Sequence, residues 1–237
     1  MSKNLFKLAV ASTVLALAAG QAFAAASVTG TVTYSGKVPN LKALDMAADP
    51  GCAAKHTGPV PSDVLVLGPG NAMANVMVRV KSPVTGTFAA PAQPAVIDQK
   101  GCHYEPHVLG LMIGQTLKLK NSDGLLHNVH ALPKVNTPFN MAMPANRTEA
   151  DTKFGKEEGM FLVKCDVHGW MTAYVGVFAN PFFAVSGADG KFSIPGLPPG
   201  TYEIEAWHEK LGVRSGSVTV AADKPAKIDF TFAPPGS

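Results

Sequence analysis

The chain has 237 residues and a formal net charge of +3; 46% of the residues are hydrophobic and 16% are charged. This composition excludes an intrinsically disordered chain, and the small charge gives no electrostatic basis for binding nucleic acid or an anionic membrane. The length allows one large domain or two small ones of about 100–150 residues each.

The first 24 residues have the features of an export signal. Lys3 and Lys7 give a positive start, residues 8–19 are apolar, and Ala22-Phe23-Ala24 forms an A-x-A cleavage site. The apolar run is too short to span a bilayer, and no other stretch reaches about 18 apolar residues. We therefore expect a mature chain that starts near residue 25, lies in a bacterial periplasm, does not span a membrane and carries a charge of about +1.

The remaining sequence predicts an all-β fold. Short runs with period-two alternation are separated by Gly, Pro, Asn and Asp, and no long segment has helical periodicity. Residues 40–62, 83–94 and 134–147 have the composition of loops, and residues 149–158 that of a solvated turn. In chain order, we expect strands at residues 28–34, 64–67, 74–80, 96–98, 107–112, 115–120, 127–131, 160–164, 173–178, 192–194, 202–206, 213–220 and 227–232.

One heptapeptide carries the most specific chemical signal. Cys165, His168 and Met171 lie three residues apart, and His127 and His130 offer further imidazoles upstream. Two imidazoles, one thiolate and a weak thioether form the ligand set of a mononuclear blue-copper site. A thioether is a poor ligand for zinc, so the motif predicts copper and redox chemistry. Along a strand, His127 and His130 point to opposite faces, so only one of them can join this site.

The three cysteines cannot all pair in an oxidising compartment. If Cys165 binds copper, Cys52 and Cys102 remain as a candidate disulfide that closes a loop of about 50 residues and contributes about 4 kcal/mol. A disulfide from Cys165 to either of them would destroy the copper site.

Residues 95–178 resemble the cupredoxin family, the plastocyanin- and amicyanin-like blue copper proteins. The similar segments are Tyr104-Glu-Pro-His-Val108, residues 114–123, His127-Asn128-Val129 and the Cys-x-x-His-x-x-Met loop. The resemblance implies a Greek-key β-sandwich in which His127, Cys165 and His168 bind copper and Met171 is the axial ligand. It also implies that the side chain of Asn128 ties the two ligand segments together.

The C-terminal segment resembles carboxypeptidase regulatory-like domains, which have a transthyretin-like sandwich fold. The similarity lies in Asp189-Gly-Lys-Phe192 and in Gly196-Leu-Pro-Pro-Gly200-Thr-Tyr202. We expect a β segment at 25–94, a cupredoxin domain at 95–178 and a smaller β domain at 179–237. Each flank alone has too few strands for a core, so we hypothesise that the two flanks form one sandwich around the inserted domain.

These features predict a periplasmic one-electron carrier and not an enzyme. The sequence has no H-E-x-x-H or nucleophile-elbow motif. The cupredoxin resemblance implies electron transfer through the outer edge of His168 to a cytochrome c or a periplasmic dehydrogenase. Two alternatives stay open: a copper-delivery protein without an electron-carrier role, and an interaction module in which copper is secondary.

Two further features allow two interpretations each. Alternate positions along a strand put the side chains of His103, Glu105 and His107 on one face. They form either a second metal site or a set of structural residues. Trp170 is either a core residue or part of an exposed apolar rim beside His168.

Overall fold

The protein is all-β, as the sequence predicts. The structure, a computed structural model, describes residues 26–222 and 224–234, so the expected export signal lies outside the described part of the chain. Two short helical turns are present, α1 (Pro50–Ala53) and η1 (Pro69–Asn71). The strands are β1 (Ala26–Tyr34), β2 (Met77–Val80), β3 (Ala95–Lys100), β4 (His103–Glu105), β5 (Val108–Met112), β6 (Thr116–Asn121), β7 (His127–Ala131), β8 (Phe139–Met143), β9 (Glu149–Lys153), β10 (Glu158–Lys164), β11 (Thr172–Phe178), β12 (Phe183–Val185), β13 (Lys191–Leu197), β14 (Gly200–His208), β15 (Gly212–Val220), β16 (Ala226–Lys227) and β17 (Phe230–Phe232).

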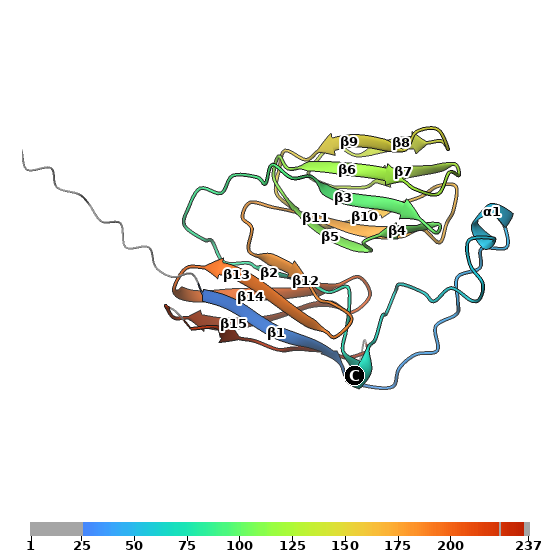
Figure 1. The fold of residues 1–237 in the computed structure, drawn as a ribbon. Helices are drawn as coiled ribbons and strands as arrows, with labels where there is room; N and C mark the ends of the chain where they lie inside the picture. The colour runs from blue at the N-terminus through green and yellow to red at the C-terminus, as the bar shows by residue number, and fades with distance from the viewer. Residues whose placement is uncertain (1–25, 223, 235–237) are drawn as a thin grey trace, which may run out of the picture.

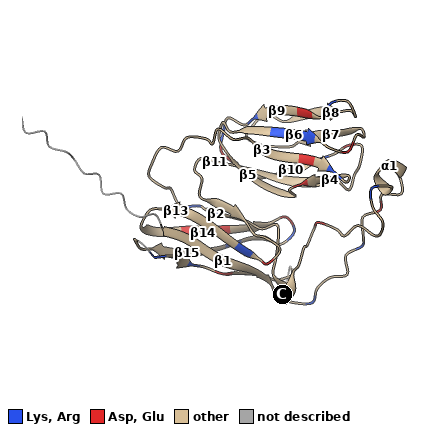
Figure 2. Ribbon diagram, in the orientation of Figure 1, with Lys and Arg blue, Asp and Glu red and all other residues tan. Residues whose placement is uncertain are grey.

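Strands β3 to β11 form a first sandwich (Figure 1). One sheet has the order β5-β11-β10-β7-β8 and the other has the order β4-β3-β6-β9. Inward-facing side chains of both sheets, such as Ile97, Leu119 and Val175, form a shared hydrophobic core. Figure 2 shows acidic residues on β9 beside basic ones on β6, where Lys118 Nζ lies 3.0 Å from Glu149 Oε2.

A second sandwich combines strands from both ends of the chain. Strand β1 pairs with β13, β16 and β17, while the facing sheet has the order β12-β2-β14-β15. The core between the sheets includes Val28, Ile194, Ile204 and Phe232. Strands β1 and β2 thus precede the first sandwich, and their partners follow it. The domain boundaries at residues 94/95 and 178/179 stay a prediction.

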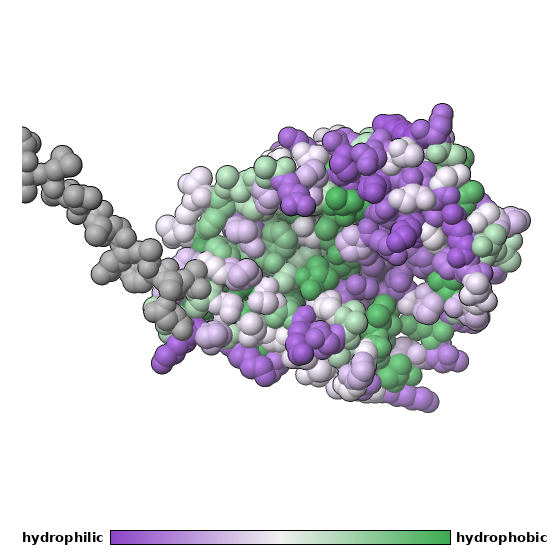
Figure 3. All heavy atoms as spheres, in the orientation of Figure 1, coloured by the Kyte–Doolittle hydropathy of each residue, from purple (hydrophilic) through white to green (hydrophobic). Residues whose placement is uncertain are grey.

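The two sandwiches meet along an interface with both apolar and polar contacts. Met77, Val108 and Phe178 form a small hydrophobic cluster there. Beside it, His107 Nε2 donates to Glu209 Oε1 at 2.7 Å. In Figure 3, hydrophilic residues cover much of the first sandwich, and hydrophobic ones gather at the level where the sandwiches meet. No helix within the described residues is long and apolar enough to cross a membrane.

Three sequence-based expectations about local structure were wrong. Residues 134–147 are not all loop, because β8 occupies Phe139–Met143, and the charged stretch from residue 149 begins with β9. Both are outer strands whose side chains alternate in exposure. Strand β9 has the charged side chains that are common on such edges, whereas β8 has none. Residues 64–67 form no strand; only Leu67 makes an isolated bridge, with Met73.

Candidate metal centre

Neighbouring strands and one tight loop hold the candidate ligands. His127 is the first residue of β7, and Cys165 follows the last residue of β10, which pairs with β7. His168 and Met171 lie in the loop between β10 and β11. Two backbone hydrogen bonds close this loop, from Met171 N to His168 O at 2.9 Å and from Cys165 N to Met171 O at 3.1 Å. The loop is therefore short and internally bonded, as a preformed metal site requires.

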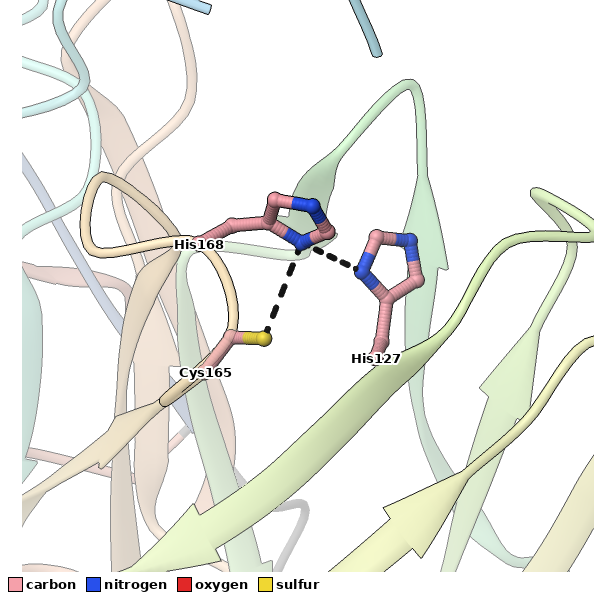
Figure 4. A group of neighbouring side chains, drawn as sticks. All are labelled: His127, Cys165 and His168. Carbon is pink, nitrogen blue, oxygen red and sulfur yellow. Dashed lines mark hydrogen bonds between the residues drawn. The ribbon is translucent and has the colours of Figure 1, made fainter. Parts of the chain in front are cut away.

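Three donor atoms converge in this loop region (Figure 4). His127 Nδ1 lies 2.9 Å from His168 Nδ1, and His168 Nδ1 lies 3.8 Å from Cys165 Sγ. His127, Cys165 and His168 are each at most 2% exposed. Met171 is also buried and belongs to the same hydrophobic cluster as Cys165. The structure therefore brings together the predicted imidazole–thiolate–imidazole set.

Asn128 joins the two ligand segments. Its Oδ1 accepts from Cys165 Sγ at 3.3 Å and from the backbone N–H of Asp166 at 2.7 Å. Its Nδ2 donates to Asn140 Oδ1 at 2.7 Å and to Asp166 Oδ2 at 3.1 Å. One amide thus orients the thiol and fixes the distance between β7 and the loop after β10.

Each imidazole is also held from behind by a carboxylate. His127 Nε2 donates to Asp123 Oδ2 at 3.0 Å, and His168 Nε2 donates to Asp49 Oδ2 at 2.9 Å. Neither carboxylate was predicted from the sequence. The four-residue spacing of Asp123 and His127 is a weak signal that could have suggested the first, whereas nothing in the local sequence links Asp49 to His168.

These contacts make the space between the donor atoms electron-rich. When both Nε2 atoms carry hydrogens, both Nδ1 atoms present lone pairs to each other. Their 2.9 Å separation then requires a proton or another cation between them. Together with the Cys165 thiolate, this set of borderline and soft donors fits a copper ion. The residues present therefore fit the metal that the sequence motif predicts.

The ionisation of the metal-free site agrees with this geometry. Burial alone would raise the pKa of Cys165, but hydrogen bonding, led by that from His127, lowers it to about 7. Burial would lower the pKa of His127, but Asp123 and Cys165 raise it to about 9. Burial would likewise raise the pKa of Asp123, yet its hydrogen bonds, led by that with His127, lower it to about 2. A metal ion would take the place of the proton that His127 retains.

The other predicted histidines lie outside the cluster. His130 is partly exposed, and its Nδ1 lies 2.9 Å from Asp166 Oδ2. His103 Nδ1 lies 2.9 Å from Asp63 Oδ2, whereas His107 donates to Glu209 in the second sandwich. His103 and His107 thus have separate partners and do not converge.

The disulfide prediction is confirmed, and its position adds a new feature. Cys52 and Cys102 are bonded, with their Cα atoms 5.7 Å apart, and Cys165 is free and buried. Cys52 Sγ lies 3.6 Å from His168 Nε2. Trp170 is half-buried; its ring centroid is 5.1 Å from that of His168, and its Nε1 donates to Cys102 O at 3.2 Å. The outer edge of His168 is therefore covered and not open to solvent, so a partner does not reach it directly, contrary to what the cupredoxin resemblance implies.

Known proteins share features with both parts of the chain. A family model described as a carboxypeptidase regulatory-like domain matches residues 173–233. No curated protein matches the chain. A solved mutant of amicyanin in its Cu(I) form is 21% identical, with a TM-score of 0.33, covering 44% of this chain and 99% of that one. The purple cupredoxin from Nitrosopumilus maritimus is 22% identical, with a TM-score of 0.30, covering 35% of this chain and 99% of that one.

A part of a larger protein is also similar. The copper-containing nitrite reductase from Thermus scotoductus SA-01 is 20% identical, with a TM-score of 0.32, and the match covers 41% of this chain and 25% of that one. Both families that the sequence motifs resemble are therefore among the matches.

Proposed function

We propose that this chain is a periplasmic blue-copper protein that carries one electron at a time between partner proteins. His127, Cys165 and His168 would hold a single copper ion, with Met171 as the axial ligand. The observation that carries this proposal is the convergence of one thiol and two imidazole nitrogens in a buried site. Copper would supply the Cu(I)/Cu(II) couple.

The chain's own residues would keep the site similar in both oxidation states. The bonds that close the loop fix Cys165 and His168, and the carboxylates of Asp123 and Asp49 fix the two rings. Burial keeps water from adding to the ligand set. A site whose ligands move little needs little reorganisation when an electron arrives, so this rigidity supports a carrier.

The same burial supports electron transfer over copper delivery. A delivery protein must present its ligands to an acceptor, whereas all three donors here are at most 2% exposed. A cytochrome c or a periplasmic dehydrogenase would be the redox partner, and binding to it would be weak and transient.

Addition of Cu(II) to the purified protein tests this function. We expect an intense thiolate-to-copper absorption band, retained in His130→Ala and lost in Cys165→Ser and His168→Ala. His130 is the matched control, because it lies on the same strand as His127 but outside the cluster. A protein that stays colourless with copper would overturn the proposal. Metal that passes readily from the reduced protein to an acceptor would favour delivery instead.

A further inference from the structure

A segment far upstream covers the outer edge of His168. We call residues 45–56, which include α1, the cap. Asp49 is the N-cap of α1: its Oδ1 accepts from the N–H groups of Gly51 at 2.7 Å and Cys52 at 3.2 Å. Its Oδ2 remains free to accept from His168 Nε2 at 2.9 Å. One carboxylate thus caps the start of the helical turn and holds a candidate copper ligand.

The cap also reaches the carboxylate behind the other imidazole. Lys55 Nζ lies 3.2 Å from Asp123 Oδ1 and donates to Asp123 O at 2.9 Å. A Cβ atom on Gly51 would lie 2.9 Å from a methyl carbon of Leu125, in the loop that leads to His127. The cap is therefore packed closely against the segments that carry both imidazoles.

Two contacts fasten the cap to the turn before β4, and Asp123 holds the same turn. The disulfide joins Cys52 to Cys102, and His56 Nε2 donates to Gly101 O at 2.8 Å. Asp123 Oδ1 and Oδ2 accept from the N–H groups of Gly101 and Cys102, at 2.7 and 2.8 Å. The cap, this turn and Asp123 are therefore one connected unit over the site.

We propose that Asp49 is a positioning residue of the metal centre and that the disulfide-fastened cap closes the outer edge of His168. The carboxylate fixes the His168 ring with Nδ1 directed inward, and the cap shields its Nε2 edge from partners, chelators and solvent. This inference rests on the proposed copper function, because the position of His168 matters through its role as a ligand.

The carboxylate has two physical consequences for a bound copper ion. A hydrogen bond from Nε2 to a carboxylate makes the imidazole a stronger donor and fixes its tautomer. The nearby negative charge also favours the more positive Cu(II) state, and so lowers the reduction potential. Loss of Asp49 should therefore weaken copper binding and raise the potential.

The substitution Asp49→Asn isolates the carboxylate. Asparagine is as good an N-cap as aspartate, so α1 is retained. Its amide has no negative charge to offer His168 Nε2. Asp45→Asn is the matched control, because Asp45 lies in the same segment and its carboxylate accepts from Ala47 N, not from the site. The double change Cys52→Ser/Cys102→Ser tests the fastening.

Copper affinity, reduction potential and the rate of copper removal by a Cu(I) chelator are the readouts. For Asp49→Asn we expect about 10- to 100-fold weaker copper binding and a higher potential, with the thiolate band kept because Cys165 is intact. The double serine variant should lose Cu(I) to the chelator on the order of tenfold faster. Asp45→Asn should match the unmodified protein. Equal values for Asp49→Asn and Asp45→Asn would overturn the positioning role.

A second measurement needs no copper. Diethyl pyrocarbonate modifies accessible imidazoles, and mass spectrometry locates the modified residue. In the metal-free protein we expect His168 to be protected, and to become reactive in the double serine variant. Equally strong modification of His168 in both would overturn the closed cap, and equal protection in both would overturn its fastening by the disulfide, whatever copper does. If His168 is protected but the protein fails to bind copper, the proposed function is overturned, whereas the closed cap still holds.

Discussion

At the scale of single residues, the buried histidines differ in what faces their two ring nitrogens. His127 and His168 have a carboxylate behind and other donor atoms in front. His208, in the second sandwich, is 2% exposed, and its Nδ1 accepts from the N–H groups of Lys210 and Leu211, both at 3.3 Å. The first two therefore suit a metal ion, whereas His208 suits a neutral structural role.

His208 should make the protein sensitive to acid. Burial lowers its pKa below the ordinary 6.5; Glu209 opposes this, while His107 and Lys210 add to it. The unfolded chain then binds the proton more readily than the folded one, so stability is lost as pH falls below 6.5 towards the folded pKa. The free energy of unfolding falls by about 1.4 kcal/mol for each unit by which folding lowers the pKa of His208.

Urea unfolding of the copper-free protein between pH 8 and 5 measures this effect. The variant His208→Gln should show a flatter fall in the free energy of unfolding than the unmodified protein. The difference between the two at pH 8, where the histidine is neutral, gives the cost of the substitution itself. Parallel curves down to pH 5 would contradict the prediction.

The sequence predicted the donor atoms but not the groups behind them. Cys165, His168 and Met171 lie within one heptapeptide, so their spacing alone indicates a shared site. Asp49 lies 119 residues before His168, and it reaches the ring because the disulfide holds α1 over the loop. Such a contact depends on tertiary structure, and no local pattern carries it.

At the scale of elements, alternation located the strands with buried faces. The expected strand at 127–131 coincides with β7, and the one at 28–34 lies within β1. Strand β9 was missed because it is an outer strand with mostly charged and polar side chains. Strand β8 does alternate, with Phe139, Met141 and Met143 on the core side, but the Pro- and Asn-rich residues around it have the composition of a loop. Alternation therefore predicts a strand best where the flanking residues do not have the composition of a loop.

Strand β1 allows a sharp test of packing in the second sandwich. A Cβ atom on Gly30 would lie 1.8 Å from the backbone oxygen of Ile228 and 2.7 Å from the Phe192 ring. Gly30→Ala should therefore force the backbone apart and cost about 1–3 kcal/mol or more. Each kcal/mol lowers the melting temperature by roughly 2–4 °C in a chain of this size.

Gly159→Ala, in β10, is the matched control. A Cβ atom there meets nothing within 4 Å, so we expect a change within about 0.5 kcal/mol. Thermal unfolding followed by circular dichroism compares the two variants. Similar melting temperatures would show that β1 does not approach Ile228 as closely as described.

At the scale of the whole molecule, a buried polar contact joins the two sandwiches. His107 donates to Glu209 Oε1 at 2.7 Å and Tyr174 Oη donates to Glu209 Oε2 at 3.1 Å. The side chains of His107 and Glu209 are 6% and 5% exposed. His107 Nδ1 also lies 3.0 Å from the backbone oxygen of Thr172, the residue after Met171. The contact thus connects the second sandwich to the strand that leaves the metal loop.

Glu209→Gln should weaken this connection without affecting the candidate copper ligands. Hydrogen bonds to charged groups contribute about 1.5–3 kcal/mol, so we expect a loss of that order in the free energy of unfolding. Glu203→Gln is the control, because Glu203 is half-exposed and its ion pair with Lys81 contributes at most about 1 kcal/mol. Urea unfolding measures both. An equal effect of the two changes would contradict a structural role for the contact between His107 and Glu209.

The pairing of β1 has a consequence for the order in which the protein folds. Thr33 in β1 contacts Thr231 in β17, 198 residues later, so the second sandwich has to wait for the end of the chain. Every strand of the first sandwich, by contrast, lies between Ala95 and Phe178. Before they fold, the residues between β2 and β12 are one long flexible loop. Once they have folded, only the short segments that flank the first sandwich remain flexible, so bringing β2 and β12 together costs less entropy. The folded first sandwich would then hold the two ends of the chain close together and so favour their pairing.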